Sequence, residues 1–437
     1  PPVLEALSAG GDLSAYHPEN YPFWHRYGPG HNDLSKQVYA YAALAGPSFF
    51  LSMGRQAVAF GSGHRSWMMV RDFPYHLAKF MYEGVDFAPQ QGIDYTVRDA
   101  RLVFAGALDL SFSYALVVMA EDHNLLGLGI TYHHLVPTYG VFLGIDAMDY
   151  RVPSDSQLTV RSLEASWGYS LPMNYVNNDL TTDFGLDQGS GMAVDVGMSY
   201  YFLKKRVRKN MFSDPRPCNN GFEDYTLRLG VSVMDVGRLR YLNNALVHEV
   251  GGQGTDWHGV DTVEFRNVLY FNQLLSTRFY GVPNRSVRDY AFTVYTPAVF
   301  SFQADASLGK GLYFQTLFLH PIRLGDPWIR HPVMLYAMPR FESRFFEAGL
   351  PMSLYDFTRL HAGLYFRIGW LTLGSDDLGL LFSPRNFDSG GLYAGIRINL
   401  LPGRCGQASM LPRGRSSMMN SIGRMKRGRH VPCEAYW

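Results

Sequence analysis

The stretch from Met192 to Phe202 constrains the fold most strongly, because its residues alternate in character along its whole length. Every even position is apolar, whereas the odd positions are mostly small or polar. A period of two is typical of an extended strand with two different faces. Residues 225–233 and 360–370 repeat the pattern. Soluble sheets mostly use strands of about 5–6 residues, whereas a tilted strand needs roughly 9–11 residues to cross a bilayer. The alternation therefore predicts an all-β fold, a transmembrane antiparallel β-barrel with apolar side chains facing lipid.

The composition of the chain agrees with a barrel and argues against a helical membrane protein. Charged residues make up 18% of the 437 residues and aromatic residues 15%, and the mean hydropathy is −0.11. The sequence contains no apolar run of about 18 residues, the length that a membrane-spanning helix requires. A net charge of +1 gives no reason to expect nucleic acid as a partner.

The N-terminal residues 1–35 are rich in Pro, Gly, His and Tyr and show no regular period. The segment Glu19–Trp24 is too aromatic for a solvated tail, so we expect a plug folded into the lumen rather than a loose terminus. The start at Pro1 lacks the basic and apolar regions of a signal peptide. Because a barrel in the outer membrane must be exported, we expect the numbering to begin after cleavage of such a peptide.

Residues 36–400 are predicted to form the outer-membrane barrel. Residues 74–84 read as a short helix, with Asp72 as its cap and Gly84 at its end. About fourteen crossings are expected, within a range of about twelve to sixteen, because single-chain bacterial barrels have an even number of strands. In addition to the three stretches above, strands are predicted at residues 37–45, 48–62, 108–116, 126–132, 139–150, 158–171, 298–308, 312–319, 333–338, 345–354 and 392–400.

Residues 239–290 are the least regular part of the predicted barrel. They contain His248, Glu249, Asp256, His258 and Asp261, residue types that bind metal ions. Their spacing follows no known ligand pattern, so we expect a surface loop rather than a metal site. We predict no metal and no cofactor for the chain.

Three aspartates fall on the polar faces of predicted strands: Asp195, Asp235 and Asp305. Carboxylates in a lumen usually pair with arginines on neighbouring strands, and Arg228 is the natural candidate for such a partner. The only trace of a nucleophile motif, Gly61-Ser62-Gly63, matches Gly-x-Ser-x-Gly in part and lacks the strand–turn–helix context. We therefore predict no catalytic residues and no enzymatic activity.

The C-terminal residues 401–437 differ from everything before them, because seven basic residues are opposed by the single acidic residue Glu434. Such a basic run is ordinarily disordered. We expect a periplasmic tail that docks on an acidic partner protein or the anionic cell wall, with docking inside the lumen as the alternative. Cys405 and Cys433 either pair or stay free, as Cys218 would. The predicted partner-binding residues are Arg413, Arg415, Arg424, Lys426, Arg427, Arg429, Tyr436 and Trp437.

Four motifs in order, Gly189–Gly197, Asp224–Gly237, Thr372–Gly379 and Gly390–Arg397, resemble a family of uncharacterised outer-membrane barrels of Bacteroidota. That family is distantly similar to the fatty-acid-channel and type 9 secretion shuttle barrels. The resemblance extends over about residues 36–400. The ending Pro432–Tyr436 is similar to a Cys-Pro-Ala-Tyr ending, with Glu434 in place of Pro. The start differs, because Tyr27–Asn32 stands where such proteins tend to have Asn-Pro-Ala. The resemblance supplies no catalytic residues.

Two functions remain from these observations. The first is a structural or scaffolding barrel in a multi-protein outer-membrane complex for secretion or assembly. Its partners would be other outer-membrane or periplasmic proteins, together with outer-membrane lipid or lipopolysaccharide. The alternative is a passive channel or shuttle for hydrophobic small molecules, which would need an apolar lumen pocket. The predicted lumen positions are instead small and polar, and they include Arg228, Arg367 and Arg397.

Overall fold

The computed structural model describes residues 35–180, 186, 188–204, 225–343, 346–378 and 390–396. All twenty strands in this part of the chain belong to one sheet, and every pairing between them is antiparallel. The fold is therefore all-β, as predicted. The predicted plug (except for Ser35) and the tail at 401–437 lie outside the described residues.

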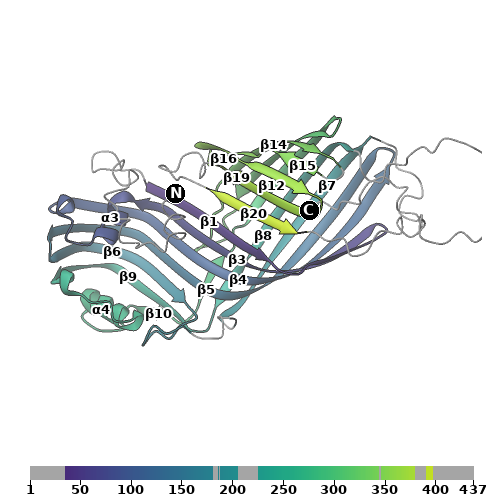
Figure 1. Cartoon of the computed structure of the whole chain (residues 1–437). Coiled ribbons are helices and arrows are strands. Elements are labelled where there is room, and N and C mark those ends of the chain that lie inside the picture. Colours follow the sequence, from purple (N-terminus) through teal and green to yellow (C-terminus); the bar gives the residue numbers. More distant parts are fainter. Residues whose placement is uncertain are drawn as a thin grey trace, which may run out of the picture.

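The elements follow one another along the chain as shown in Figure 1. The first strands are β1 (Ser35–Ala45), β2 (Phe49–Met53), β3 (Gln56–Pro74), β4 (Asp94–Glu121), β5 (Asn124–Ser154), β6 (Gln157–Ser170), β7 (Gly189–Leu203), β8 (Tyr225–Tyr241) and β9 (Ala245–His258). The later strands are β10 (Val287–Asp289), β11 (Phe292–Tyr295), β12 (Val299–Gly309), β13 (Leu312–Pro321), β14 (Met334–Glu342), β15 (Phe346–Gly349), β16 (Met352–Tyr355), β17 (Arg359–Ala362), β18 (Leu364–Ile368), β19 (Leu371–Asp377) and β20 (Gly391–Ile396). The helices are α3 (Tyr75–Glu83) and α4 (Val268–Tyr280), with 3-10 turns η3 (Ala88–Gln90) and η5 (Val260–Thr262).

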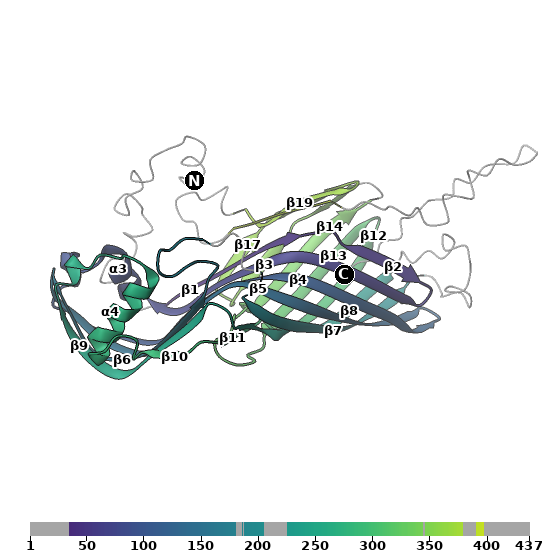
Figure 2. The same ribbon diagram turned by 90° about the horizontal axis from the view of Figure 1, so that it is seen from below.

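The sheet has two parts, which share the long strands β4 and β5. Residues 124–135 of β5 pair with β7, whereas residues 140–154 pair with β6. We call the part with β1–β3, β7, β8 and β12–β20 the curled part, and the part with β6, β9, β10, α3 and α4 the extension. β4 and β5 run through both parts (Figures 1 and 2). With 31 residues at about 3.3 Å each, β5 is far longer than one membrane crossing requires.

The curled part bends strongly about its inner face. Arg65 on β3 forms an ion pair of 2.6 Å with Asp235 on β8, although β4, β5 and β7 lie between these strands in the sheet. In a flat sheet, four strand spacings of about 4.8 Å would separate β3 from β8 by about 19 Å. Side chains of Arg and Asp cannot span that distance, so the sheet must curve until the two strands face each other.

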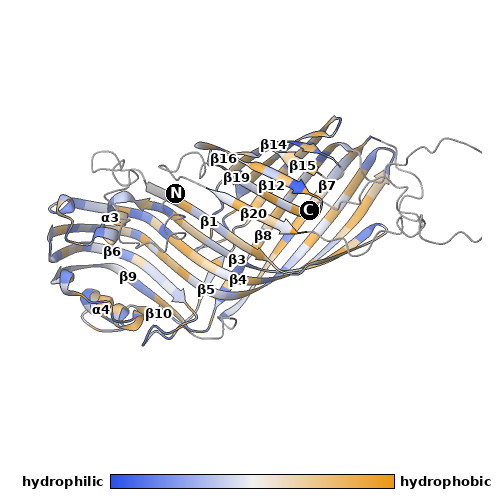
Figure 3. Ribbon diagram, viewed as in Figure 1, coloured by the Kyte–Doolittle hydropathy of each residue, from blue (hydrophilic) through white to orange (hydrophobic). Residues whose placement is uncertain are grey.

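The alternation along β7 is confirmed by the exposure of its side chains. Met192, Val196 and Met198 are 46%, 54% and 50% exposed, whereas Ala193 between them is fully buried. Large apolar side chains therefore lie on the outer face of the curled part, and the small and polar set lies on the inner face. Figure 3 shows hydrophobic segments recurring along these strands. Neither helix in the described part of the chain has the length and apolar character needed to cross a membrane.

Three predicted strands are interrupted in the structure. Residues 48–62 do not form one strand, because β2 and β3 meet at a tight turn in which Gly54 has φ +62°. Residues 345–354 are divided into β15 and β16 around Leu350 and Pro351, and residues 360–370 are divided at Gly363. Pro351 has no backbone N–H to donate to a ladder, and its carbonyl oxygen accepts from Gly363 N at 2.7 Å. Conversely, 126–132 and 139–150 belong to the single strand β5.

The prediction of a surface loop for residues 239–290 is wrong. These residues form the end of β8, all of β9 and helix α4. The interval lacks a clear period of two because β9 pairs with β6 through several register shifts. The helix at 74–84 is confirmed with Gly84 at its C-terminal end, but its N-cap is Pro74 without a side-chain hydrogen bond rather than Asp72.

Helix α4 is anchored to the extension through Asn272. Its side-chain oxygen accepts a hydrogen bond of 3.3 Å from Trp167 Nε1, and its amide nitrogen donates to the hydroxyl of Tyr169. Trp167 stacks on His248 of β9 with ring centroids 5.1 Å apart. His248 is 2% exposed, and the only side-chain hydrogen bond it makes in the described structure joins Nδ1 to Ser286 Oγ at 3.0 Å. Burial lowers the pKa of His248 to about 4.

We predict that acid weakens the extension through His248. Because the folded-state pKa lies near 4 and the unfolded value near 6.5, the unfolded chain binds the proton first. The stabilisation by neutral His248 is complete above pH of about 6.5 and is lost as the pH falls towards about 4, by about 3 kcal/mol. Urea unfolding and hydrogen exchange of the β6 and β9 amides would measure this loss.

The matched variants are His248→Phe, which keeps the stacked ring without a titrating group, and His258→Phe at an exposed position of the same strand. The first variant should lose most of the acid sensitivity, and the second should retain it. Equal acid sensitivity in both variants would contradict the assignment to His248.

Candidate functional site

Five charged side chains form a network on the inner face of the curled part, one from each of five strands. Arg65 on β3 binds Asp109 on β4 through Nε at 3.1 Å and Asp235 on β8 through Nη1 at 2.6 Å. His133 on β5 and Asp195 on β7 complete what we call the inner network. The Arg65, Asp109 and His133 side chains are only 12%, 13% and 12% exposed. Charges of both signs are thus withdrawn from solvent together.

His133 occupies the centre of the inner network. Its Nδ1 lies 3.0 Å from Asp109 Oδ1, and its Nε2 lies 3.1 Å from Asp195 Oδ2. When both carboxylates are ionised they only accept hydrogen bonds, so both ring nitrogens then donate and the ring carries a positive charge. With Arg65, the network then holds two cations against three carboxylates. Neither nitrogen of His133 is left to accept a proton, which argues against a role as general base.

Asp235 is placed by an irregularity in strand β8. The β7–β8 register shifts between Val194 and Val196, so that β8 bulges at this point. Asp235 has φ +54°, a left-handed conformation that Asp tolerates better than most residues. The bulge directs its backbone N–H to Asp195 Oδ1 at 2.7 Å while its carboxylate reaches Arg65. Such bulges re-aim side chains in sheets, and here the bulge joins β7, β8 and β3.

A second ionic group lies on β12, β14, β15 and β18 and is more deeply buried. Arg340 donates to Asp305 at 2.8 Å and to the hydroxyl of Tyr225 at 3.0 Å. The side chains of Asp305 and Arg340 are 1% and 5% exposed. Glu347 accepts a hydrogen bond of 2.8 Å from Arg367 Nε and lies 3.7 Å from Arg340. A buried charge is tolerated only when paired and hydrogen-bonded, and this group meets that condition.

Apolar packing fills the inner face between the inner network and the extension. Trp67, Leu135, Leu239 and Ile329 are at most 1% exposed and belong to one cluster. Ile329 comes from the connection between β13 and β14 rather than from a strand. This connection therefore packs against the inner face of the sheet. We call the region of the cluster that contains Trp67, Leu135, Leu239 and Ile329 the waist.

Arg330, the next residue, ties the waist to both the beginning and the later part of the sheet. Its guanidinium donates to Gln37 on β1 at 3.2 Å and to Asp356 after β16 at 2.9 Å. Its backbone N–H lies 3.3 Å from Met69 Sδ on β3. One side chain thus bridges strands that are far apart along the sheet, which again requires the sheet to curve round.

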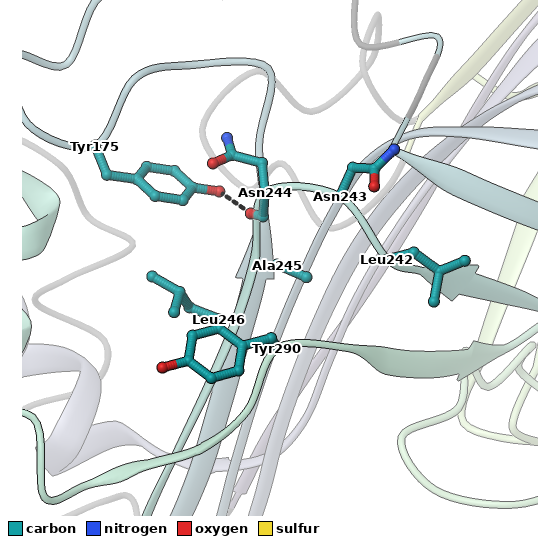
Figure 4. Close-up of a pocket in the computed structure, with 7 residues that line it drawn as sticks. All are labelled: Tyr175, Leu242, Asn243, Asn244, Ala245, Leu246 and Tyr290. Atoms are coloured by element: carbon teal, nitrogen blue, oxygen red, sulfur yellow. Dashed lines mark hydrogen bonds between the residues drawn. The ribbon is translucent and has the colours of Figure 1, made fainter.

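An open pocket of about 420 Å³ lies at the edge of the extension (Figure 4). Tyr175 donates its hydroxyl hydrogen to Asn244 O at 2.7 Å, and Asn244 Nδ2 donates to Leu171 O and Met173 O. These polar groups are engaged within the chain, so they give no ground for assigning a ligand. The lining residues are Tyr175, Leu242, Asn243, Asn244, Ala245, Leu246 and Tyr290.

The aspartates expected to face the lumen do form ion pairs, but with other partners than expected. Asp235 pairs with Arg65, Asp195 with His133, and Asp305 with Arg340. Arg228 is the register partner of Asp305 across the β8–β12 ladder, yet the buried ion pair of Asp305 is made by Arg340. The expected partner-binding residues, Arg413 to Trp437, and Arg397 lie outside the described residues.

Arg65, His133 and Arg340 were missed as site residues at the level of sequence. Each lies on the inner face of an observed strand but beyond the ends of the predicted strands 48–62, 126–132 and 333–338, so the predicted alternation does not reach them. The histidines and carboxylates between His248 and Asp261 do not come together into a metal site. The described part of the chain contains no group of three or more His, Cys, Asp or Glu residues that could hold a metal ion.

Comparison with known proteins identifies a family without identifying a function. Residues 30–376 match the model of a family of unknown function, DUF5723, and the chain belongs to this family. No curated protein and no solved structure matches the chain.

We predict that Arg65→Met is strongly destabilising. The substitution keeps the length of the side chain but leaves Asp109 and Asp235 without their cation, and breaking a buried ion pair costs about 3–5 kcal/mol. The matched control is Arg98→Met in the extension, where the pair with Asp149 is half exposed and should cost about 0–1 kcal/mol. Urea unfolding in a lipid environment would compare the two.

The double variant Arg65→Met with Asp235→Asn tests whether unpaired charge is the cause. Asn tolerates the left-handed backbone at position 235, so the second change should recover part of the loss. Equal losses for Arg65→Met and Arg98→Met would contradict the structural role of the inner network.

Proposed function

We propose that this DUF5723 chain is a structural or scaffolding β-barrel in the outer membrane of a Gram-negative bacterium, a subunit of a secretion or assembly complex. The observation that carries the proposal is the reversed distribution of side chains in the curled part. Large apolar residues are exposed on the outer face, whereas ion pairs such as Arg340–Asp305 are buried on the inner face. In water this arrangement would be unfavourable, but in lipid it is the expected one.

The extension marks where the chain would leave the lipid. In the curled part of β5, Leu128 and Ile130 are 46% and 49% exposed. On the strands of the extension, exposed positions carry charged side chains, as in the pairs Arg161–Asp94 and Arg98–Asp149, although Met81 and Tyr82 of helix α3 are also exposed. Charged residues on a lipid-facing surface are costly. We therefore infer that lipid surrounds the curled part only, and that the extension stands in water.

The interior supports a scaffold more than a passage for hydrophobic molecules. A channel or shuttle of that kind needs an apolar pocket that is open to its cargo. Here the inner network crosses the interior from β3 to β8, and the waist is filled by packed side chains around Ile329. The strands of the extension instead expose charged side chains, such as Arg98 and Arg161, which suit contacts with other proteins of a complex.

The outer face gives the sharpest test of the membrane proposal. We predict that Val196→Arg, on the outer face of β7, destabilises the protein by about 2–4 kcal/mol in a bilayer. Glu164→Arg, at an exposed position of β6 in the extension, should be tolerated because water surrounds it. Urea unfolding from lipid vesicles and the amount of protein retained after a carbonate wash of the membranes would measure both variants. Similar behaviour of the two variants would argue against lipid around the curled part.

The scaffolding role is tested through the basic tail. Deleting residues 402–437 should release the partner proteins in a pull-down from solubilised outer membranes, with the same resistance to urea as the full chain. A second variant, with Arg424, Lys426, Arg427 and Arg429 changed to Gln, separates the effect of charge from that of chain length. Unchanged co-purification in both variants would contradict docking through the tail.

A further inference from the structure

The first and last strands of the sheet, β1 and β20, each have a free edge in the described part of the chain, and β2 continues the edge of β1 along β3. β1 pairs only with β3, and β20 pairs only with β19. Both strands are highly exposed: Leu44 is 75% and Tyr41 52% exposed on β1, and Leu392 is 81% and Ile396 66% exposed on β20. The bridge from Gln37 through Arg330 to Asp356 shows that the curvature brings β1 towards the last third of the sheet.

The direction of the two free strands follows from the pairing order. The path runs β1–β3–β4–β5–β7–β8–β12–β13–β14–β15–β18–β19–β20, and every step is antiparallel. The path has an even number of steps, so β1 and β20 point the same way. A direct pairing between them would be parallel. One additional strand between them would be antiparallel to both. It would raise the number of strands along this path from odd to even, and single-chain bacterial barrels have an even number of strands.

We propose that the gap between β1 and β20, which we call the seam, accepts one extended strand from another polypeptide. The inference rests on the proposed membrane position, because lipid leaves the backbone groups of an open edge without partners. The added strand must run antiparallel to both edges, that is, towards the extension. It should present apolar side chains outward, beside Leu44 and Leu392, and small side chains inward, beside Tyr39 and Tyr393.

Other occupants fit less well. A second copy of this chain in the same membrane orientation would present β1 and β20 in the same direction as the first copy, so it would pair in parallel with either edge. Neither terminal segment, 1–34 nor 401–437, contains a stretch in which apolar and polar residues alternate. Strand addition to a free edge is a common mode of peptide recognition, in which the backbone supplies affinity and alternate side chains supply specificity.

The test uses the full chain in lipid vesicles and a synthetic peptide that alternates valine and serine over about eleven residues, the length of one crossing. Cys218, Cys405 and Cys433 are changed to Ser, and single reporters Ala42→Cys on β1 and Ala394→Cys on β20 are introduced. Each peptide of the series carries one cysteine at a different position. Directly opposed residues in antiparallel strands have Cβ atoms about 4.5–5.5 Å apart, so one position should form a disulfide at least tenfold faster than the others.

Moving the β1 reporter from Ala42→Cys to Ala40→Cys should shift the best peptide position two residues towards the peptide C-terminus. The matched control is the same peptide with N-methylated amides at alternate positions, which cannot complete the ladder and should lose the preference. A shift in the opposite direction, or equal rates for both peptides, would overturn the proposal. A direct disulfide between reporters at 42 and 394 would show a seam that closes in parallel.

Binding of the peptide only after deletion of residues 402–437 would identify the chain's own tail as the occupant and would also overturn the proposal. A carbonate wash of the same vesicles separates this inference from the membrane proposal. A chain that the wash removes refutes the membrane position. A chain that stays in the membrane but does not capture the peptide refutes the seam alone.

Discussion

The ion pair between Arg65 and Asp235 is the constraint on which the shape of the curled part depends. The two residues lie on strands separated by three others, yet their side chains meet at 2.6 Å. Asp109, His133 and Asp195 connect the intervening strands to the same network, so each strand contributes one charge. Because an unpaired charge in this interior would be far more costly than a paired one, the network favours one curvature and one register over the alternatives. Stability and shape are therefore specified by the same contacts.

Strand β5 runs through both the curled part and the extension, and its exposed side chains differ between the two. β5 carries exposed Leu128 and Ile130 in the curled part and half-exposed Asp146 and Asp149 in the extension. The extension buries an ordinary apolar core beneath its helices, including Val97, Val152 and Trp257. The strands of the curled part thus expose large apolar side chains, whereas those of the extension expose charged ones, on one continuous backbone. The proposed membrane boundary near the waist would account for this contrast.

Sequence predicted the regular strands well because a period of two is a local signal. Residues 192–202 and 225–233 lie within observed strands, and the predicted strand 298–308 matches β12 (Val299–Gly309) to within one residue at each end. The same signal could not show that 126–132 and 139–150 are one strand, because the period continues unchanged from the curled part into the extension. It also could not show the breaks at Pro351 and Gly363, which depend on a hydrogen bond between distant segments.

For the candidate site, the face on which most of the charged residues lie could be predicted from the period of two, but their ion-pair partners could not. Parity along a strand places Asp195 and Asp305 on the inner face, and the same parity holds for Arg65 and His133. Asp235 shares the parity of the outward residues Val231 and Val233 and reaches the inner face only because β8 bulges. Which cation meets which carboxylate depends on the curvature, which joins β3 to β8, and on the bulge that re-aims Asp235. Neither feature leaves a local pattern. Arg228 was the natural choice as the partner across neighbouring strands, but the deeper position of Arg340 supplied the buried ion pair.

The waist shows why the two parts can act as one body. Gly140 on β5 lies beneath the ring of Tyr241, where an added Cβ would come within 2.3 Å of the ring. Gly106 on β4 lies in the same way beneath Tyr139. Tyr241 is fully buried and donates its hydroxyl hydrogen to Tyr139 O at 2.7 Å. Because two glycines on adjacent strands each admit a large ring, the strands pack without a gap where they leave the curled part. A force on the extension would then reach the inner network through rigid strands rather than a flexible linker, as a membrane-anchored scaffold requires.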